Sequence, residues 1–250
     1  MIDRTSDGLR IAVLAAMMLL EALSAGCSNR SPQPQEHIQS PQAPGLVLVE
    51  QEPISVKKEF FDRGSTQSKQ VAEEHNQSAN THWKFQCVPK FRFHIVKMTE
   101  ANPRPGDHVV TVKLRITSVS VFLAAPVTIY LPKLAKPEVV SHEDGHFKIC
   151  KKVYDRDARP AAQSAAQALI GKEFEGSGNS LELASQEALH HAAQEMGRGF
   201  RSKTIDYLDR VSAYYDQLTP QHPESKYVDV CVEAAFKAEE QMQAKNKIKS

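Results

Sequence analysis

The sequence predicts an α+β fold in which a small antiparallel sheet comes first and a helical half follows. Three observations predict it. Between Trp83 and Leu131, apolar residues alternate with polar ones, as in strands with one buried face. After Pro137, apolar residues recur at the spacings of amphipathic helices. The first helical stretch carries His142 and His146, four residues apart.

Residues 1–26 have the pattern of a signal peptide of the lipoprotein type. A basic start with Arg4 and Arg10 precedes a short apolar run, and small residues follow up to Cys27. Roughly ten apolar residues cannot cross about 30 Å of hydrocarbon, which favours a secretory signal over a membrane span. The small residues before cysteine resemble the bacterial lipoprotein box, which implies cleavage before Cys27 and lipids on that residue. Ordinary signal cleavage and an uncleaved anchor are the alternatives.

Residues 27–55 are expected to be the lipidated cysteine and a disordered tether. The segment is rich in Pro, Gln and Ser, so it cannot bury enough apolar surface to offset its ordering entropy. A lipid on Cys27 would make the membrane a partner and would hold the protein at the bacterial outer membrane or in the periplasm. Ser28 stands where inner-membrane lipoproteins of enterobacteria have aspartate, which favours the outer membrane. Without the lipid, the protein would be secreted.

Residues 56–250 are long enough for one domain with its own core. The whole chain has 31 basic and 30 acidic side chains and a formal net charge of +1. Nucleic-acid binders typically carry a strong excess of basic residues, so this charge balance argues against that class. Cys87, Cys150 and Cys231 lie in this domain, and in an oxidising envelope two of them could pair. Their spacings are too wide for a cysteine zinc knuckle, and the sequence leaves the pairing open.

Strands and helices are expected in that order along the domain. The expected strands are 84–88, 91–96, 108–117, 118–124 and 127–131, with a loop at 102–107 and a break at Ala125-Pro126, because proline interrupts a ladder. The expected helices run from Pro137 to about 157, from after Pro160 to the glycines at 176–178, from Ser180 to Gly197, over 203–218 and over 228–249.

The stretch His142-Glu143-Asp144-Gly145-His146 predicts a zinc site. On a helix, residues four apart lie one turn above each other, so both imidazoles point the same way and can bind one Zn²⁺. Glu143 then lies beside the open coordination position. There it can take a proton from zinc-bound water and return it to a leaving amine. The alternative is a surface helix with two incidental histidines.

The stretches TIYLPKLAKPEVVSHEDGHFKIC (128–150) and YYDQLTPQH (214–222) resemble a bacterial family of predicted secreted zinc-dependent proteases, an HExxH domain-of-unknown-function family. The resemblance covers residues 83–224 and rests on Leu131-Pro132 at a strand end, on the metal motif, and on the late Tyr215-Asp216-x-x-Thr219. It implies a zincin-like helix, a Zn²⁺ cofactor, metallopeptidase activity and a peptide or protein substrate. After Thr219 the chain departs from the family, with an added Gln221 before the histidine and proline in place of glycine after it.

A catalytic zinc normally has three protein ligands, so a third is expected. The late motif points to His222. The alternatives are a site without a third protein ligand, or a residue of the third helix, which offers Glu187, His190 and His191. Asp216 is expected to orient a ligand histidine through its second ring nitrogen. Tyr215, or Tyr214 beside it, is expected to donate to a developing oxyanion unless it belongs to the core.

The sequence therefore predicts an enzyme, a zinc metallopeptidase that hydrolyses peptides at the bacterial cell envelope with zinc-bound water activated by Glu143. The alternative comes from another class. It is a non-catalytic, lipid-anchored envelope binding or scaffold protein with a structural or vestigial metal motif. A third ligand and an open coordination position separate the two.

Overall fold

The computed structural model describes residues 45–62, 79–102, 104, 107–221 and 227–249. The signal peptide, Cys27, most of the expected tether and His222 lie outside the described residues. None of the described helices is long and apolar enough to cross a membrane.

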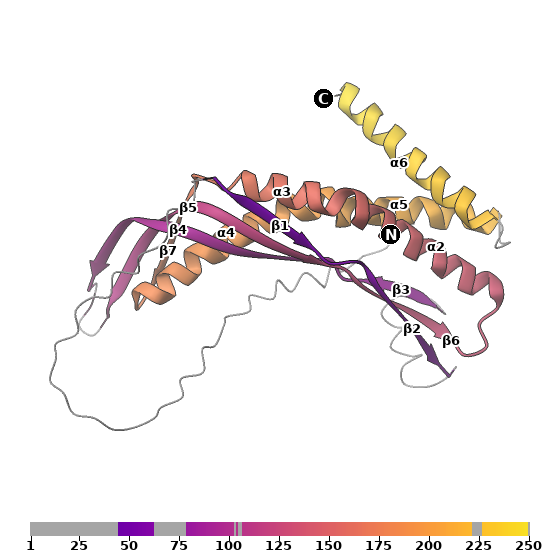
Figure 1. The fold of residues 1–250 in the computed structure, drawn as a ribbon, viewed down its shortest axis with the longest axis horizontal. Coiled ribbons are helices and arrows are strands. Elements are labelled where there is room, and N and C mark those ends of the chain that lie inside the picture. Colours follow the sequence, from indigo (N-terminus) through magenta and orange to yellow (C-terminus); the bar gives the residue numbers. More distant parts are fainter. Residues whose placement is uncertain (1–44, 63–78, 103, 105–106, 222–226, 250) are drawn as a thin grey trace.

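A four-stranded sheet is built around one long central strand (Figure 1). β5 (Val109–Ala124) pairs over its whole length with the antiparallel β4 (Gln86–Ala101). On its other side, β5 pairs near its start with the antiparallel β7 (Glu173–Gly178) and near its end with the parallel β1 (Val47–Gln51). The inward face of β5 supplies most of the buried side chains of the sheet.

A three-stranded sheet continues from the end of β5. β6 (Pro126–Pro132) lies between the parallel β2 (Ser55–Phe61) and the antiparallel β3 (Asn80–Trp83). Ala125 alone separates β5 from β6, which confirms the predicted break at this point. The chain passes there from one sheet to the other (Figure 1).

The α+β class is confirmed, but the expectation of one small antiparallel sheet is wrong. Both sheets are mixed, because β1 and β2 run parallel to β5 and β6. β1 also lies within the expected tether of 27–55, so the folded domain begins before residue 56. The half-buried Val47 and Val49 give this short strand an apolar side that packs against the core.

Two pairs of expected strands merge. Segments 84–88 and 91–96 both belong to β4, and segments 108–117 and 118–124 both belong to β5. Pro89 lies within β4 without ending it. Among the described strands, β4 pairs only with β5, and an edge strand tolerates a missing backbone donor on its outer side.

The motif helix is longer than expected. α2 (Pro137–Val153) begins with proline in its first turn, as predicted, and continues through a π-helical turn (Tyr154–Ala158) into α3 (Arg159–Gln167). Pro160 was expected to start a separate helix. The π turn shifts the backbone hydrogen bonds by one residue, and proline then occupies a first-turn position, where its missing N–H is not needed.

The next helices differ from the expectation at two places. Residues 173–178 were expected to end a helix, but they form β7. A Cβ atom on Gly176 would overlap backbone atoms of Ala184 and Ala188 on α4 (Leu181–Lys203), so glycine lets this helix lie directly on the strand. The Ser180 cap is confirmed, because its Oγ accepts a hydrogen bond from Leu183 N at 3.3 Å. α4 does not stop at Gly197; it continues to Lys203.

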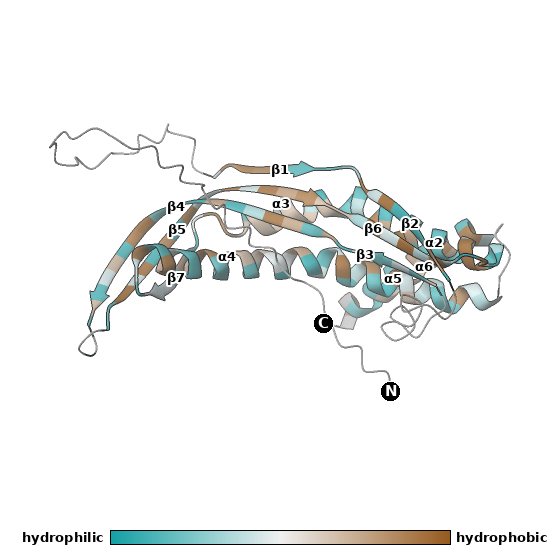
Figure 2. Ribbon diagram, turned by 90° about the horizontal axis from the view of Figure 1, so that it is seen from below, coloured by the Kyte–Doolittle hydropathy of each residue, from teal (hydrophilic) through white to brown (hydrophobic). Residues whose placement is uncertain are grey.

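The last helices confirm the expectation and complete the core. α5 (Ile205–Leu218) and α6 (Val228–Lys249) both pack against α2, and a 3₁₀ turn (Thr219–Gln221) ends the described part before α6. α4 lies along β7 and β5 on one face of the long sheet (Figure 2). α2 packs against β3 and β6, so the motif helix is held between the short sheet and α5.

Candidate metal centre

Three donor atoms from α2 and α5 converge at one point. His142 Nε2 and His146 Nε2 lie 3.2 Å apart, which the four-residue spacing on a helix permits. Asp216 Oδ1, from α5, lies 2.9 Å from His146 Nε2 and 3.4 Å from His142 Nε2. Among the described residues, these three side chains form the group of histidine and carboxylate donors that could hold a metal ion.

The donor set fits a small tetrahedral ion. Tetrahedral ligands at bond lengths of about 2.0 to 2.1 Å lie about 3.3 Å from one another, close to the three separations observed. The set is two nitrogens and one carboxylate oxygen, which is a combination found at catalytic zinc. The side chains of His142 and Asp216 are 32% and 39% exposed, whereas that of His146 is 10% exposed. The site therefore opens to solvent on the side of His142 and Asp216.

Without an ion, the surroundings of His142 favour its protonated form. Burial lowers the pKa of His142, but the hydrogen bond to Asp216 and the charges of Glu143 and Asp216 outweigh it, so this pKa lies above its ordinary value. For Asp216, burial raises the pKa, and the hydrogen bonds to the two imidazoles outweigh it, so this pKa lies below its ordinary value. A metal ion and a proton thus compete for the same nitrogen.

Glu143 lies beside the cluster and is buried. Its side chain faces β3, where Thr81 Oγ1 lies 2.7 Å from Glu143 Oε2. Burial raises the pKa of Glu143 above its ordinary value, although the charges of His146 and His142 and the Thr81 hydrogen bond partly oppose this. The carboxylate is therefore near the donor atoms without belonging to the group that they form.

Tyr215 supports the histidines from α5. Its ring stacks on His142 at a centroid distance of 5.2 Å and meets His146 edge-on at 5.0 Å. Its hydroxyl donates to the backbone carbonyl of His142 at 3.3 Å, and the residue is 0% exposed. The hydroxyl is thus engaged with the helix backbone. This arrangement gives no support to the expected oxyanion role.

Asp216 also differs from its expected role. It was expected to contact the second ring nitrogen of a ligand histidine, but its Oδ1 faces the same Nε2 atoms that would bind an ion. The other nitrogen of His146, Nδ1, is buried and has no hydrogen-bond partner among the described residues. Asp216 is therefore a candidate ligand, and no carboxylate of the described residues bonds to Nδ1 of His146.

The third-helix residues lie away from the cluster. The carboxylate of Glu187 accepts a hydrogen bond from Ser177 N on β7, and His191 Nδ1 lies 3.0 Å from the Glu175 backbone oxygen. The His190 side chain bonds along its own helix, to Gln194 at 2.8 Å. None of the three belongs to the donor group of the described residues. His222 lies outside those residues, so its expected role stays a prediction.

β3 contributes side chains to the site that no sequence motif indicates. Thr81 bonds to Glu143, and the Trp83 ring lies 6.4 Å from the ring of His146. The four residues of β3 carry no motif, and their place beside α2 depends on pairing with β6, far along the chain. Thr81 and Trp83 could have been predicted only from the register in which β3 pairs with β6.

All three cysteines of the described residues are free thiols. Cys150 on α2 and Cys231 on α6 are buried, and burial raises the pKa of the Cys87 thiol to about 12. No two of these three cysteines pair, and the sequence had left their pairing open.

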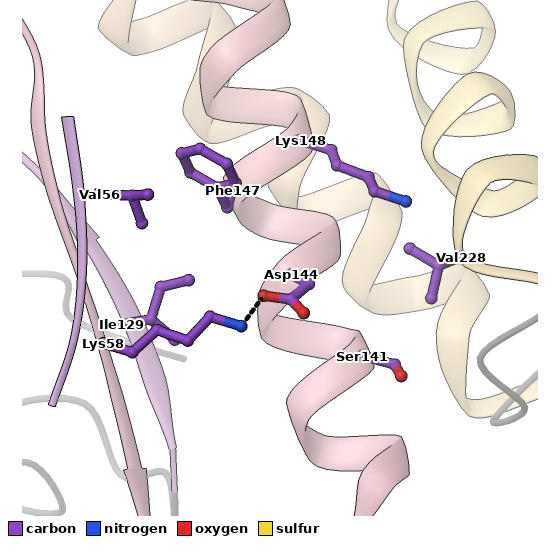
Figure 3. A pocket seen from close by; sticks show the side chains of 8 residues that line it. All are labelled: Val56, Lys58, Ile129, Ser141, Asp144, Phe147, Lys148 and Val228. Atoms are coloured by element: carbon purple, nitrogen blue, oxygen red, sulfur yellow. Dashed lines mark hydrogen bonds and ion pairs between the residues drawn. The ribbon is translucent and has the colours of Figure 1, made fainter. Parts of the chain in front are cut away.

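A pocket of about 400 Å³ lies beside α2 (Figure 3). Val56, Ile129, Phe147 and Val228 give it apolar walls, and Lys58 bonds to Asp144 at 2.7 Å beside it. Neither histidine of the motif lines this pocket. The two features use different residues of the same helix.

Comparisons with protein-family models, with curated proteins and with solved structures find no match for this chain.

Proposed function

We propose that the chain is a zinc metallopeptidase of the bacterial cell envelope, similar to the family of predicted secreted zinc-dependent proteases. One observation carries the proposal. The Nε2 atoms of His142 and His146 and the Oδ1 atom of Asp216 converge at 2.9–3.4 Å from one another, with the carboxylate of Glu143 next to them. Three donors and an exposed side correspond to a catalytic zinc site, whereas structural zinc sites have four protein ligands.

Each residue has a defined task in this proposal. His142, His146 and Asp216 would hold the ion, which when bound would act as a Lewis acid on the scissile carbonyl and lower the pKa of water. Glu143 accepts a proton on its carboxylate and returns it to the leaving amine. Its raised pKa suits the first step, because a carboxylate with a higher pKa takes up a proton more readily. The substrate class is a peptide or protein.

The envelope location rests on the N-terminal sequence alone. The lipoprotein-type pattern before Cys27 and the Pro- and Gln-rich segment after it support a lipid-anchored domain at the outer membrane or in the periplasm. We expect Cys27→Ala to release the domain from membranes or to leave an uncleaved precursor. An unmodified Cys27 in the mature protein, detected by mass spectrometry, would rule out the anchor.

Peptide hydrolysis tests the enzymatic proposal. A mixed library of internally quenched peptides is suitable, because no particular substrate is indicated. Glu143→Gln should keep its zinc and lose on the order of 10²-fold or more in hydrolysis rate. Glu187→Gln on α4 is the matched control and should retain full activity. Hydrolysis that survives in zinc-loaded Glu143→Gln would contradict the proposal.

The alternative is a lipid-anchored binding or scaffold protein that uses the metal structurally. It predicts zinc binding without any hydrolysis, and a protein that unfolds more readily when the metal is removed. The exposure of His142 and Asp216 favours the enzyme, because an ion at this place is reachable from solvent.

A further inference from the structure

Thr81 on β3 and Glu143 on α2 are joined inside the protein. Each residue is 4% exposed. Thr81 Oγ1 lies 2.7 Å from Glu143 Oε2 and 3.1 Å from the backbone oxygen of the same residue. A hydroxyl has one proton, so it donates to one of these oxygens at a time. Because both acceptor oxygens belong to Glu143, the Thr81 hydroxyl bonds to that residue in either case.

Both partners come from packed elements. Thr81 pairs in the sheet with Ile129 of β6, whose side chain is fully buried, and Glu143 lies on a helix that packs against the same two strands. The backbone on each side of the contact is therefore fixed. A carboxylate held at one oxygen by such a partner has little freedom to rotate.

Packing does not explain why a carboxylate is present at this position. Burying a charge is costly, and an apolar side chain of similar volume would fill the space without that cost. Among the described residues, Oε2 of Glu143 accepts the Thr81 hydrogen bond and Oε1 has no such donor. One oxygen is therefore held by Thr81, and the other is not.

We propose that Thr81 is a positioning residue, whose hydroxyl holds Oε2 of Glu143 so that Oε1 is the oxygen that takes and returns the proton. The proposal rests on the peptidase function proposed above. It predicts that the hydroxyl of Thr81 matters for turnover and not for metal binding, since Thr81 contacts the carboxylate and neither imidazole.

Thr81→Val removes the hydroxyl and keeps the shape, while Thr81→Ser keeps the hydroxyl and serves as the control. The full chain would be used, with zinc affinity measured by competition with a chromophoric chelator and kcat and KM measured on the quenched peptide library. We expect Thr81→Val to keep the zinc affinity of the wild type within about threefold and to lose at least about tenfold in kcat with a smaller change in KM. Thr81→Ser should stay close to wild type. In a Glu143→Gln background, Thr81→Val should cause no further loss, because the two residues act as one unit.

Infrared spectroscopy gives a second readout that needs no activity. The carboxylate band of Glu143, identified by its loss in Glu143→Gln, should shift in Thr81→Val and stay in place in Thr81→Ser. An unshifted band, or full kcat in a Thr81→Val protein, would overturn the proposal, as would an equal loss of zinc affinity and turnover in Thr81→Val. A zinc-loaded wild type that cleaves no peptide would overturn the proposed function instead, and the band alone would then decide whether Thr81 orients Glu143.

Discussion

The hydroxyl of Tyr215 lies where a side chain on Gly145 would have to be. A Cβ atom built on Gly145 would overlap both Oη and Cζ of that tyrosine. The absence of a side chain lets α5 approach α2 closely at this turn. Asp216, the next residue of α5, thereby reaches the two histidines that flank the glycine on α2.

Gly145→Ala should therefore destabilise the protein and weaken zinc binding. In a helix that packs on nothing, alanine would stabilise by about 1 kcal/mol relative to glycine. Here we expect a loss of about 1–3 kcal/mol, because the methyl group displaces a buried ring. Chemical denaturation without metal measures the first effect, and chelator competition measures the second.

Gly199→Ala is the matched control. Gly199 also lies in a helix, α4, but its Cβ would meet only Ala165 Cβ at 3.3 Å and Ala165 Cα at 3.9 Å. We expect its unfolding free energy to stay within about 1 kcal/mol of wild type. If Gly145→Ala were as stable as Gly199→Ala and bound zinc normally, the close approach would not be what places Asp216.

The ion-free cluster should show a defined pH dependence. The pKa of His142 is raised above 6.5, so its stabilising contribution is complete below pH 6.5 and is lost as the pH rises through the raised value. The pKa of Asp216 is lowered below 3.8, so its contribution is complete above pH 3.8 and is lost as the pH falls through the lowered value. Both contributions are present between these limits.

The variant Asp216→Asn tests this pH dependence. Without metal, the difference in unfolding free energy between wild type and this variant should be largest between pH 3.8 and pH 6.5 and should shrink at higher pH. A difference that stays constant from about pH 5 to about pH 9 would mean that no protonated histidine pairs with Asp216.

The thiols give an independent check of the core. Cys150 and Cys231 are buried, and burial raises the pKa of Cys87 to about 12 and also raises that of Cys150. These three thiols should react slowly with a disulfide reagent at about pH 8 in the folded protein and react fully in denaturant, because the thiolate is the reactive form. Mass spectrometry that found a disulfide among them would contradict the packing described.

Much of the fold could be predicted from local sequence. The alternation in 108–117 predicted the central strand, and the apolar face of 203–218 predicted α5. The parallel strands could not be predicted, because β1 and β2 take their direction from partners more than 60 residues away. β7 was missed for a similar reason. The sequence pattern at Gly176 and Gly178 predicted the end of a helix, whereas these glycines let α4 lie close to the strand.

The candidate site was predictable only where its geometry is local. The spacing of His142 and His146 on one helix lets their Nε2 atoms meet. Glu143 is the residue after His142, so its place beside the two histidines could be predicted as well. The position of the third donor, Asp216, depends on how α5 packs against α2. The pattern of residues within either helix does not predict that packing. Asp216 was therefore recognised as part of the site but given the wrong position relative to the imidazoles.

The third ligand can be identified by single substitutions. If Asp216 binds the ion, Asp216→Asn should lower zinc affinity by more than the roughly 10–100-fold that loss of an outer partner causes. Glu187→Gln and His191→Ala should leave it unchanged, because both side chains bond to β7. His222→Ala tests the third ligand that the sequence predicts, because His222 lies outside the described residues. A large loss in His222→Ala with normal affinity in Asp216→Asn would assign the third position to His222.

The zinc content of the purified chain tests the central claim most directly. Elemental analysis should find one zinc ion per chain in wild type and in Glu143→Gln, because that glutamate lies beside the donor group. It should find none in the His142→Ala/His146→Ala double variant, provided that the variant keeps the helical circular dichroism of the wild type. Equal zinc content in wild type and the folded double variant would contradict the account.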